Sequence, residues 1–389
     1  MNISSNLYPG SQNPQSFPLL TFPDVPRILT IRLMHGDEQV KLALSSKKME
    51  QYIKFTKIRK FDNCQVSIKE KDFTIHIDDG YIEGDGKIRE YKETFWLTGK
   101  KMKPWFNDNS TVVENTIAVM KRLQATFPCI EIEIVFYITQ PTEIKKILDA
   151  LNNFVFVSLK RTKPETATVD AIMESYKKRR EISIYSSEMP SDYSHPNAFK
   201  FRTIYYKDAR WVRLEHLFSM TGNWNVRLGK TNFTSEDLNA LFKYWTTSET
   251  RLTRVLEIEL TEESNFQKRT IFEGLIVLRT IRSRKRFRLI ANHKKKFVLY
   301  VWWTSRHFII CTYPPADFFP SAYRTLPSRK TDKKKLLLKR EYRILEILQR
   351  KKVLEDTAGN QEEIRQLEEE LALNEVYYVR GTPHIKDIE

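Results

Sequence analysis

Short apolar segments recur at nearly constant spacing through the middle of this chain. Three of the intervals between them contain helical patterns with the same apolar spacing, i, i+3, i+4 and i+7. A strand and a helix repeated every ~20–29 residues are typical of solenoids, in which each unit buries its apolar face only against its neighbours. The segments are centred at steps of 25, 25, 22, 22 and 30 residues, on Ile132, Val157, Ile182, Ile204, Val226 and Leu256. We therefore expect a leucine-rich-repeat-like α/β arc over about 128–260.

The helical intervals differ in how well they match this pattern. The full pattern occurs in Ile144/Ile147/Leu148/Leu151, Val169/Ile172/Met173/Tyr176 and Leu238/Leu241/Phe242/Trp245, and a partial one in Leu214/Leu217/Phe218. The 182–204 interval instead contains Pro190 and Pro196, which disfavour a helix. No strict repeat consensus is present, so a generic α/β domain with parallel strands remains the alternative.

Both flanks of this region have the two-residue period of antiparallel strands. Residues 65–98 alternate apolar and polar side chains, and Asp79-Gly80 and Asp85-Gly86 are hairpin-turn sequences. Residues 107–127 are helical in pattern. After residue 270, apolar runs at 275–277, 287–289, 297–302 and 308–310 predict a four-stranded antiparallel meander. The predicted fold class is therefore α+β.

Charge divides the C-terminal third into blocks within a chain of net charge +16. Residues 279–296 contain nine Lys or Arg and no acid, residues 324–352 contain twelve basic and three acidic residues, and residues 353–375 contain eight acids and one Arg. The last two blocks have opposite sign and helical apolar spacing, which predicts a charge-paired helical hairpin over 328–375. Only the 279–296 block is left as an uncompensated basic surface.

The N-terminal region has more apolar surface than a small helical unit can bury. Residues 1–16 are a polar, flexible lead-in, and residues 17–60 predict three short helices. Asp24 can cap the first helix, with Pro26 in its first turn; Asp37 can cap the second, and Ser45 or Ser46 the third. About forty residues rarely fold firmly alone. Either the first helix caps the next domain of this chain, or it docks on another protein.

The chain shows no recognisable catalytic, metal or cofactor motif. Its seven His residues are scattered, three distant Cys residues form no metal-binding or disulfide pattern, and no phosphate-binding glycine motif occurs. We therefore predict no catalytic residues, no metal site and no cofactor. The sequence also predicts no membrane span and no secretory signal. We expect a cytoplasmic or nuclear protein.

Two segments resemble a known family. "FPLLTFPDVPRILTIRLMHGDEQVKLALSSKKMEQYI" is similar to the F-box of the large nematode F-box family, through its apolar-Pro pair, aliphatic first helix and Ser-Lys-Lys turn. "DARWVRLEHLFSMTGNWNVRLGKTNFTSEDLNALFKYW", "LTRVLEIEL" and "IFEGLIVLRTI" resemble the F-box-associated type 2 domain. The resemblance divides the chain into an F-box at 17–60 and a substrate-recognition domain at 61–313.

The resemblance implies a non-catalytic function. F-box proteins are substrate-recognition subunits of cullin-based SCF ubiquitin ligases. They dock a Skp-family adaptor, and through it a cullin, and they capture a target protein with the remaining domain. The implied adaptor-binding residues are Leu20, Phe22, Pro23, Val25, Ile28, Leu29, Leu33, Val40 and Leu44.

The target surface is predicted only as regions, namely the concave face of the arc and the basic strip. In the strip, Arg282, Arg284, Lys285, Arg286 and Arg288 would suit an acidic or phosphorylated protein. One alternative is an interaction module with a degenerate F-box that recruits no ligase, because "MHGDEQ" departs from the usual inter-helix junction. Another is a nucleic-acid-binding protein that uses the same basic residues and nearby aromatics.

Overall fold

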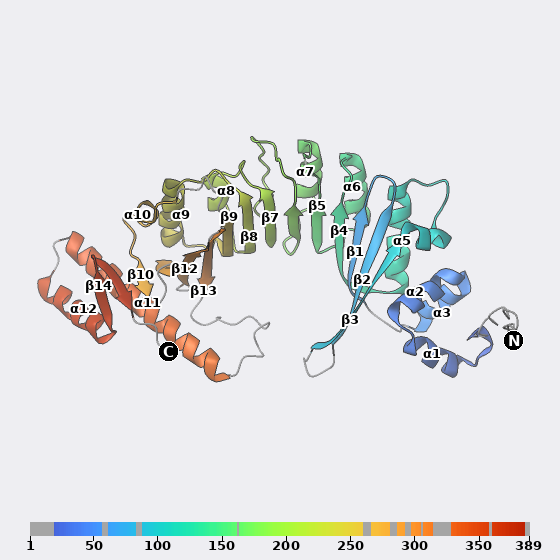
Figure 1. Cartoon of the computed structure of the whole chain (residues 1–389), viewed down its shortest axis with the longest axis horizontal. Coiled ribbons are helices and arrows are strands. Elements are labelled where there is room, and N and C mark those ends of the chain that lie inside the picture. Colours follow the sequence, from blue (N-terminus) through green and yellow to red (C-terminus); the bar gives the residue numbers. More distant parts are fainter. Residues whose placement is uncertain are drawn as a thin grey trace, which may run out of the picture. The chain divides into compact units, whose positions relative to one another are not determined.

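A computed structural model of the chain shows two compact units (Figure 1), and each is described by itself. The N-terminal unit comprises Met1–Cys64 and Thr74–Glu131, and the C-terminal unit comprises Gln65–Phe73 and Ile132–Glu389. The structure describes residues 19–56, 61–82, 88–161, 163–259, 266–280, 286–291, 297–304, 306–313, 328–357 and 360–385.

The N-terminal unit begins with the three predicted helices. A short 3-10 turn, Leu19–Thr21, precedes α1 (Asp24–Leu33), α2 (Gly36–Ser45) and α3 (Lys47–Thr56). Ser46 caps α3 by accepting a hydrogen bond from the Met49 amide at 3.2 Å. The second helix starts at Gly36 and its N-cap is His35, two residues before the expected cap Asp37; the Glu38 carboxylate accepts from the His35 amide at 2.9 Å. Their shared core contains Ile31, Val40, Ala43, Met49 and Ile53.

Strands and a longer helix complete this unit. Strands β2 (Phe73–Ile82) and β3 (Ile88–Thr98) pair antiparallel. The expected turn at Asp79-Gly80 is wrong, because both residues lie inside β2 and pair with Glu93 and Lys92. Asp85-Gly86 lies outside the described residues. After α4 (Gly99–Met102) and a 3-10 turn (Lys103–Trp105), α5 (Val112–Thr126) begins at a Thr111–Glu114 capping box. Residues of β1 (Phe61–Ile68) and β4 (Cys129–Phe136) belong to both units.

Six strands of the C-terminal unit lie parallel and in sequence order. Helices occupy most of the connections and lie along one side of the strand row in Figure 1. The strands are β4, β5 (Phe156–Leu159), β6 (Glu181–Ile184), β7 (Thr203–Asp208), β8 (Asn223–Lys230) and β9 (Thr253–Glu259). The helices are α6 (Pro141–Ala150), α7 (Thr166–Met173), α8 (Leu214–Phe218) and α9 (Ser235–Thr247).

The predicted strand centres form one cross-strand row. The register joins Ile134, Val157, Ile182, Ile204, Val226 and Leu256, all fully buried. Five of the six predicted centres are therefore confirmed, and the first is Ile134 instead of Ile132. One aliphatic residue per strand stacks on the next, so each strand buries its neighbour's apolar face.

The 182–204 interval contains no helix, as the prolines predicted. Aromatic side chains fill the space that a helix would fill. The ring of Trp211 lies 5.1 Å from that of Tyr193 and 5.2 Å from that of Tyr206. The Tyr206 hydroxyl donates to the Ala198 carbonyl at 2.5 Å. These packed rings supply the apolar burial that the irregular loop needs.

The sheet continues through antiparallel strands. β10 (Leu278–Thr280), β11 (Arg286–Ala291), β12 (Phe297–Trp303) and β13 (His307–Tyr313) form a four-stranded antiparallel meander, and β13 pairs antiparallel with β9. Three of the predicted strands are confirmed, but the first begins at Leu278, after the predicted run at 275–277. A second hairpin, β14 (Val376–Val379) and β15 (Thr382–Ile385), extends this sheet because β15 pairs parallel with β10. The short helix α10 (Lys268–Ile271) precedes β10. The mixed sheet and its helices confirm the α+β class.

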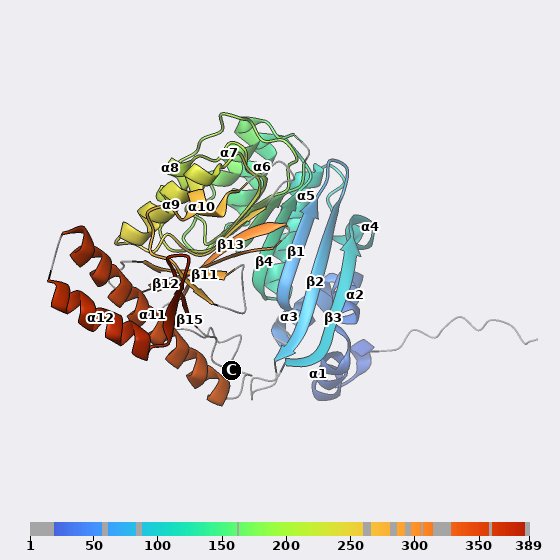
Figure 2. The ribbon, with the colours of Figure 1, turned by 60° about the vertical axis from the view of Figure 1, so that its left-hand side comes forward.

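The C-terminal helical hairpin is present, and its charges pair as predicted. Figure 2 shows α11 (Ser328–Asp356) alongside α12 (Gln361–Leu373). Ion pairs join the two helices at Arg343–Glu370 (2.9 Å) and Lys351–Glu368 (2.6 Å), and Arg350 pairs with Glu363. These partly exposed pairs fix the pairing register more than they stabilise the hairpin.

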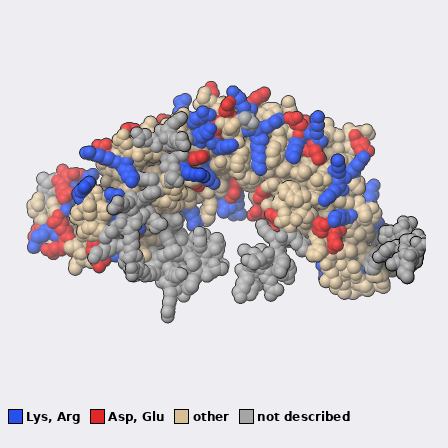
Figure 3. All heavy atoms as spheres, viewed as in Figure 1, with Lys and Arg blue, Asp and Glu red and all other residues tan. Residues whose placement is uncertain are grey.

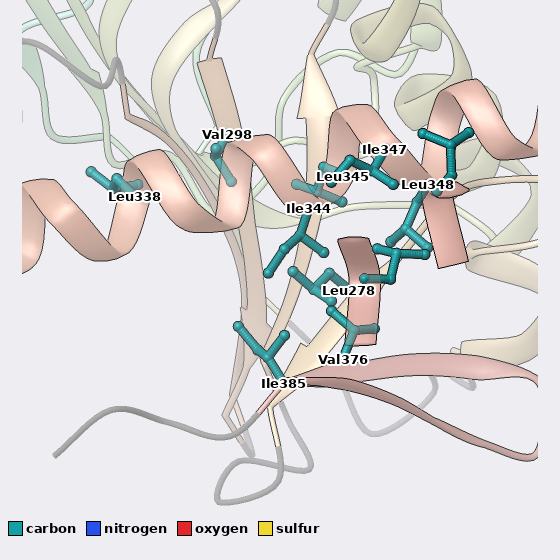
Figure 4. Close-up of a cluster of buried hydrophobic side chains, with 11 residues drawn as sticks. Leu278, Val298, Leu338, Ile344, Leu345, Ile347, Leu348, Val376 and Ile385 are labelled. Carbon is teal, nitrogen blue, oxygen red and sulfur yellow. The ribbon is translucent and has the colours of Figure 1, made fainter. Parts of the chain in front are cut away.

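The hairpin is not a separate domain, because it shares a hydrophobic core with the sheet. Figure 4 shows Ile344 and Leu348 of α11 beside Leu278 of β10, Val376 of β14 and Ile385 of β15. Val298 of β12, Leu367 and Leu371 belong to the same buried cluster. The hairpin therefore forms one layer over the antiparallel end of the sheet.

Candidate functional site

The first helix exposes a stripe of large aliphatic side chains. Val25, Leu29 and Leu33 follow one another at i, i+4 and i+8, so they lie on one face of α1. Their exposed fractions are 68%, 53% and 85%. Isolated exposed aliphatic residues are ordinary, but three in one helical row form a continuous apolar surface. We call these three residues the α1 stripe.

The other expected docking residues divide into three groups. Phe22 and Ile28 are half-buried, and Pro23 is exposed. The prediction was wrong for Val40 and Leu44, because both side chains are buried in the core of the three helices. Periodicity had placed them on an apolar face, and that face turned out to be the covered one. The Leu20 side chain lies outside the described part of the structure.

The stripe is held in place from the opposite side of α1. The Arg27 guanidinium lies 4.2 Å from the ring centre of Tyr52 on α3 and also pairs with Asp24. The Gln39 side chain donates to the Ile31 carbonyl at 2.9 Å, which ties α2 to α1. Phe55, near the end of α3, is also strongly exposed, and the sequence did not predict it as a docking residue.

The three helices also pack on the rest of their unit. Arg122 of α5 binds the Glu50 carboxylate of α3, with its Nε 2.8 Å from Oε1, and the guanidinium stacks over Trp105 at 4.7 Å. The three-helix segment is therefore both a cap on α5 and the carrier of a bare apolar stripe. In Figure 3, the face of the N-terminal helices that is visible carries mostly uncharged side chains.

The predicted basic strip is only partly described, and its one well-placed member is not a surface residue. Arg288 is buried and pairs with the buried Glu341 of α11, with Nε 2.5 Å from Oε1. The prediction for Arg288 was wrong, because its β-strand position faces the hairpin core. Arg282, Arg284 and Lys285 lie outside the described residues, as does the Arg286 side chain.

A second exposed surface lies on the sheet face opposite the Ile134–Leu256 row. At the carboxyl ends of four neighbouring strands, the aligned row Phe136, Leu159, Ile184 and Tyr206 is followed directly by Tyr137, Lys160, Tyr185 and Lys207. Their alternation places the Lys160 ammonium 5.8 Å from the Tyr137 ring and 5.6 Å from the Tyr185 ring. Among the described residues, no carboxylate pairs with Lys160 or Lys207. We call this surface the strand face.

The strand face changes charge along the sheet. Tyr205 of β7 contacts Tyr185 edge-to-face at 5.0 Å, and the Arg227 guanidinium of β8 lies 5.6 Å from the Tyr205 ring. Arg227 then approaches Glu257 of β9 at 3.4 Å, and Glu259 is exposed two residues further on. At the carboxyl ends of the strands, the face is therefore basic and aromatic over β5–β8 and acidic at β9.

Burial raises the pKa of the Tyr205 phenol, with Glu259 and Tyr185 acting in the same direction and Arg227 opposing them. The hydroxyl therefore stays protonated and remains a hydrogen-bond donor.

A pattern in the sequence also indicates the strand face. The residue three positions after each of four strand centres is Tyr137, Lys160, Tyr185 and Lys207 in turn.

A separate cleft of about 880 Å³ lies within the C-terminal unit between α10, β10 and the hairpin. Phe272, Phe287 and Tyr378 supply aromatic walls, and Arg269 and Lys352 supply cations.

Among the described residues, no three His, Cys, Asp or Glu side chains are grouped so as to hold a metal ion. Within the same residues, no helix combines the length and apolar character needed to cross a bilayer.

No protein-family model matches the chain, and no curated protein or solved structure is significantly similar to it.

Proposed function

We propose that the protein is the substrate receptor of a cullin-based ubiquitin ligase, and that the α1 stripe docks a Skp-family adaptor. The observation that carries this proposal is the bare Val25–Leu29–Leu33 row on a helix that is otherwise fixed to its unit. Covering apolar surface favours association, and a few central side chains usually dominate the binding energy of an interface. The resemblance to nematode F-box sequences supplies the identity of the partner.

The division of labour also fits the proposal. A receptor subunit acts by holding its target near the ubiquitin-conjugating enzyme, which raises the local concentration of the target. It therefore needs two binding surfaces and no reactive group. The α1 stripe and the strand face lie in different units of the chain, so each can be altered without touching the other. We assign target capture to the strand face, within the leucine-rich-repeat-like arc.

The test is co-purification of the full chain with a purified Skp-family adaptor. Leu33→Asp and Leu29→Asp should each reduce adaptor binding at least about tenfold, because a carboxylate in an apolar interface must be desolvated. Leu373→Asp is the matched control, since Leu373 on α12 has the same 85% exposure as Leu33 but lies in the C-terminal unit. Equal adaptor binding by Leu33→Asp, Leu29→Asp and the control would refute the proposal.

A ligase-free interaction module makes a different prediction in the same experiment. If the wild-type chain binds the adaptor but the complex fails to recruit a purified cullin, the ligase function is wrong while the docking surface stands. If the wild-type chain binds no adaptor at all, both parts fail.

A further inference from the structure

We infer that the strand face binds a peptide in polyproline II form with the charge pattern acid-x-x-acid-x-x-base. This inference deepens the target-capture part of the proposed function and names the chemical class of the target segment. It rests on the register of Lys160, Lys207 and Glu259 and on the absence of a carboxylate partner for the two lysines among the described residues.

The spacing follows from sheet geometry. Lys160, directly after β5, and Lys207 on β7 are separated by two strand spacings, which is about 9.6 Å. Lys207 and Glu259 on β9 are again two strands apart. A peptide crossing the strands as a polyproline II helix advances about 3.1 Å per residue and has three residues per turn, so side chains three positions apart lie on one face, about 9.3 Å apart. Two acids three positions apart would therefore meet the two lysines, and a base three positions later would meet Glu259.

The tyrosines add selectivity for anions. Tyr185 lies between the two lysines at the same register position and is 42% exposed. Its hydroxyl and that of Tyr205 can donate to carboxylate oxygens, and the hydrogen bonds would be charge-assisted. Gly229, which occupies the register position between Lys207 and Glu259, has no side chain to obstruct a peptide there.

A peptide fits this surface better than a single-stranded nucleic acid. Base stacking requires free aromatic faces. Here Lys160 approaches the rings of Tyr137 and Tyr185, and Arg227 approaches the ring of Tyr205. Glu257 and Glu259 on β9 would also repel a continuous phosphodiester chain. The mixed signs of charge instead match a peptide that carries both acids and a base.

The experiment measures fluorescence anisotropy of labelled probes with the full chain at low and physiological salt. The probe is a Gly/Ser peptide containing Glu-Gly-Ser-Glu-Gly-Ser-Lys. The matched control peptide, Glu-Gly-Ser-Lys-Gly-Ser-Glu, has the same composition but places its base over Lys207. We expect the first peptide to bind about tenfold more tightly than the control and than a dT12 oligonucleotide.

Variants then test the residues. Lys160→Glu/Lys207→Glu should weaken binding of the first peptide about tenfold. Lys178→Glu/Arg179→Glu, which makes the same charge change on the exposed loop before β6, should leave it unchanged. Unaltered melting temperatures check that all chains are folded. No preference between the peptides, tighter binding of dT12, or equal effects of the two double variants would overturn the inference.

These outcomes are separate from those of the proposed function. Adaptor binding depends on the α1 stripe, and the preference between the two peptides depends on the strand face. If the chain binds the adaptor but shows no preference between the peptides, the proposed function stands and the inference about the target peptide is wrong. If the chain prefers the first peptide but binds no adaptor, the peptide site stands and the proposed ligase function is wrong.

Discussion

Arg288 of β11 and Glu341 of α11 form a buried ion pair across the contact between sheet and hairpin, with Nε 2.5 Å from Oε1. The Tyr300 hydroxyl of β12 donates to the same carboxylate, and the Arg288 guanidinium lies 5.1 Å from the Tyr300 ring. Burial, together with the negative charge of Glu341, raises the pKa of Tyr300 well above its ordinary value. These three side chains are the polar centre of an otherwise aliphatic interface.

Breaking this pair from one side should be costly. Arg288→Met leaves the Glu341 carboxylate buried without its cation, which costs about 3–5 kcal/mol in the free energy of unfolding. Replacing both partners, in Arg288→Met/Glu341→Leu, should recover most of that loss because no charge remains buried. Urea unfolding of the wild type, both single variants and the double variant measures the coupling. Additive effects of the two single substitutions would contradict the proposed pairing.

Gly229→Ala should destabilise the parallel sheet. A methyl group at this position would overlap the Lys207 carbonyl oxygen, a backbone atom that cannot rotate away. Separating the two strands should cost about 1–3 kcal/mol, as overpacking usually does. The control is Gly381→Ala, where φ is +77° but no atom lies within 4 Å of the added methyl, so only the backbone cost of about 1 kcal/mol applies. Thermal unfolding compares the two, and an equal or smaller loss for Gly229→Ala would contradict the close approach.

Acidification should weaken the loop between β6 and β7 through Asp208. Burial would raise the pKa of this carboxyl, but hydrogen bonds from Arg210 and from the Met189 amide outweigh it and lower the pKa below 3.8. The Met189 amide lies 2.9 Å from Oδ2, and Arg210 Nε lies 2.8 Å from Oδ1. Because the folded pKa is depressed, the stabilisation is complete above the unfolded value and is lost as pH falls through the folded value.

Asp208→Asn isolates this contribution. We expect the variant to be less stable than the wild type at pH 7 and to lose less stability between about pH 5 and pH 3, since it has no carboxyl to protonate. Melting temperatures across that range provide the measurement. Parallel pH profiles for the two proteins would show that Asp208 does not carry the effect.

Local patterns in the sequence predicted much of the secondary structure. The strand centres from Val157 to Leu256 were found because each strand needs one inward aliphatic residue to stack on the next. The hairpin was found because its two helices have opposite charge, as the Arg343–Glu370 pair illustrates. Both patterns depend on side chains that are close in sequence or repeat regularly along it.

The candidate sites depended on information that no local pattern contains. Spacing placed Val25, Leu29 and Leu33 on one face of their helix and Val40 and Leu44 on a face of theirs, but only packing decided that the first face is bare and the second covered. Charge runs suggested that Arg288 was a surface residue, yet its partner Glu341 is 53 positions away in the sequence.

The sequence by itself determined the periods, namely which side chains share a face of each helix or strand. The tertiary structure alone decided what covers each face and which residues of different strands meet. Lys160 and Lys207 are 47 positions apart in the sequence, and only the parallel register sets them at one level of the sheet. The reason is physical: side-chain direction follows from local backbone geometry, whereas burial and strand register depend on contacts between distant segments.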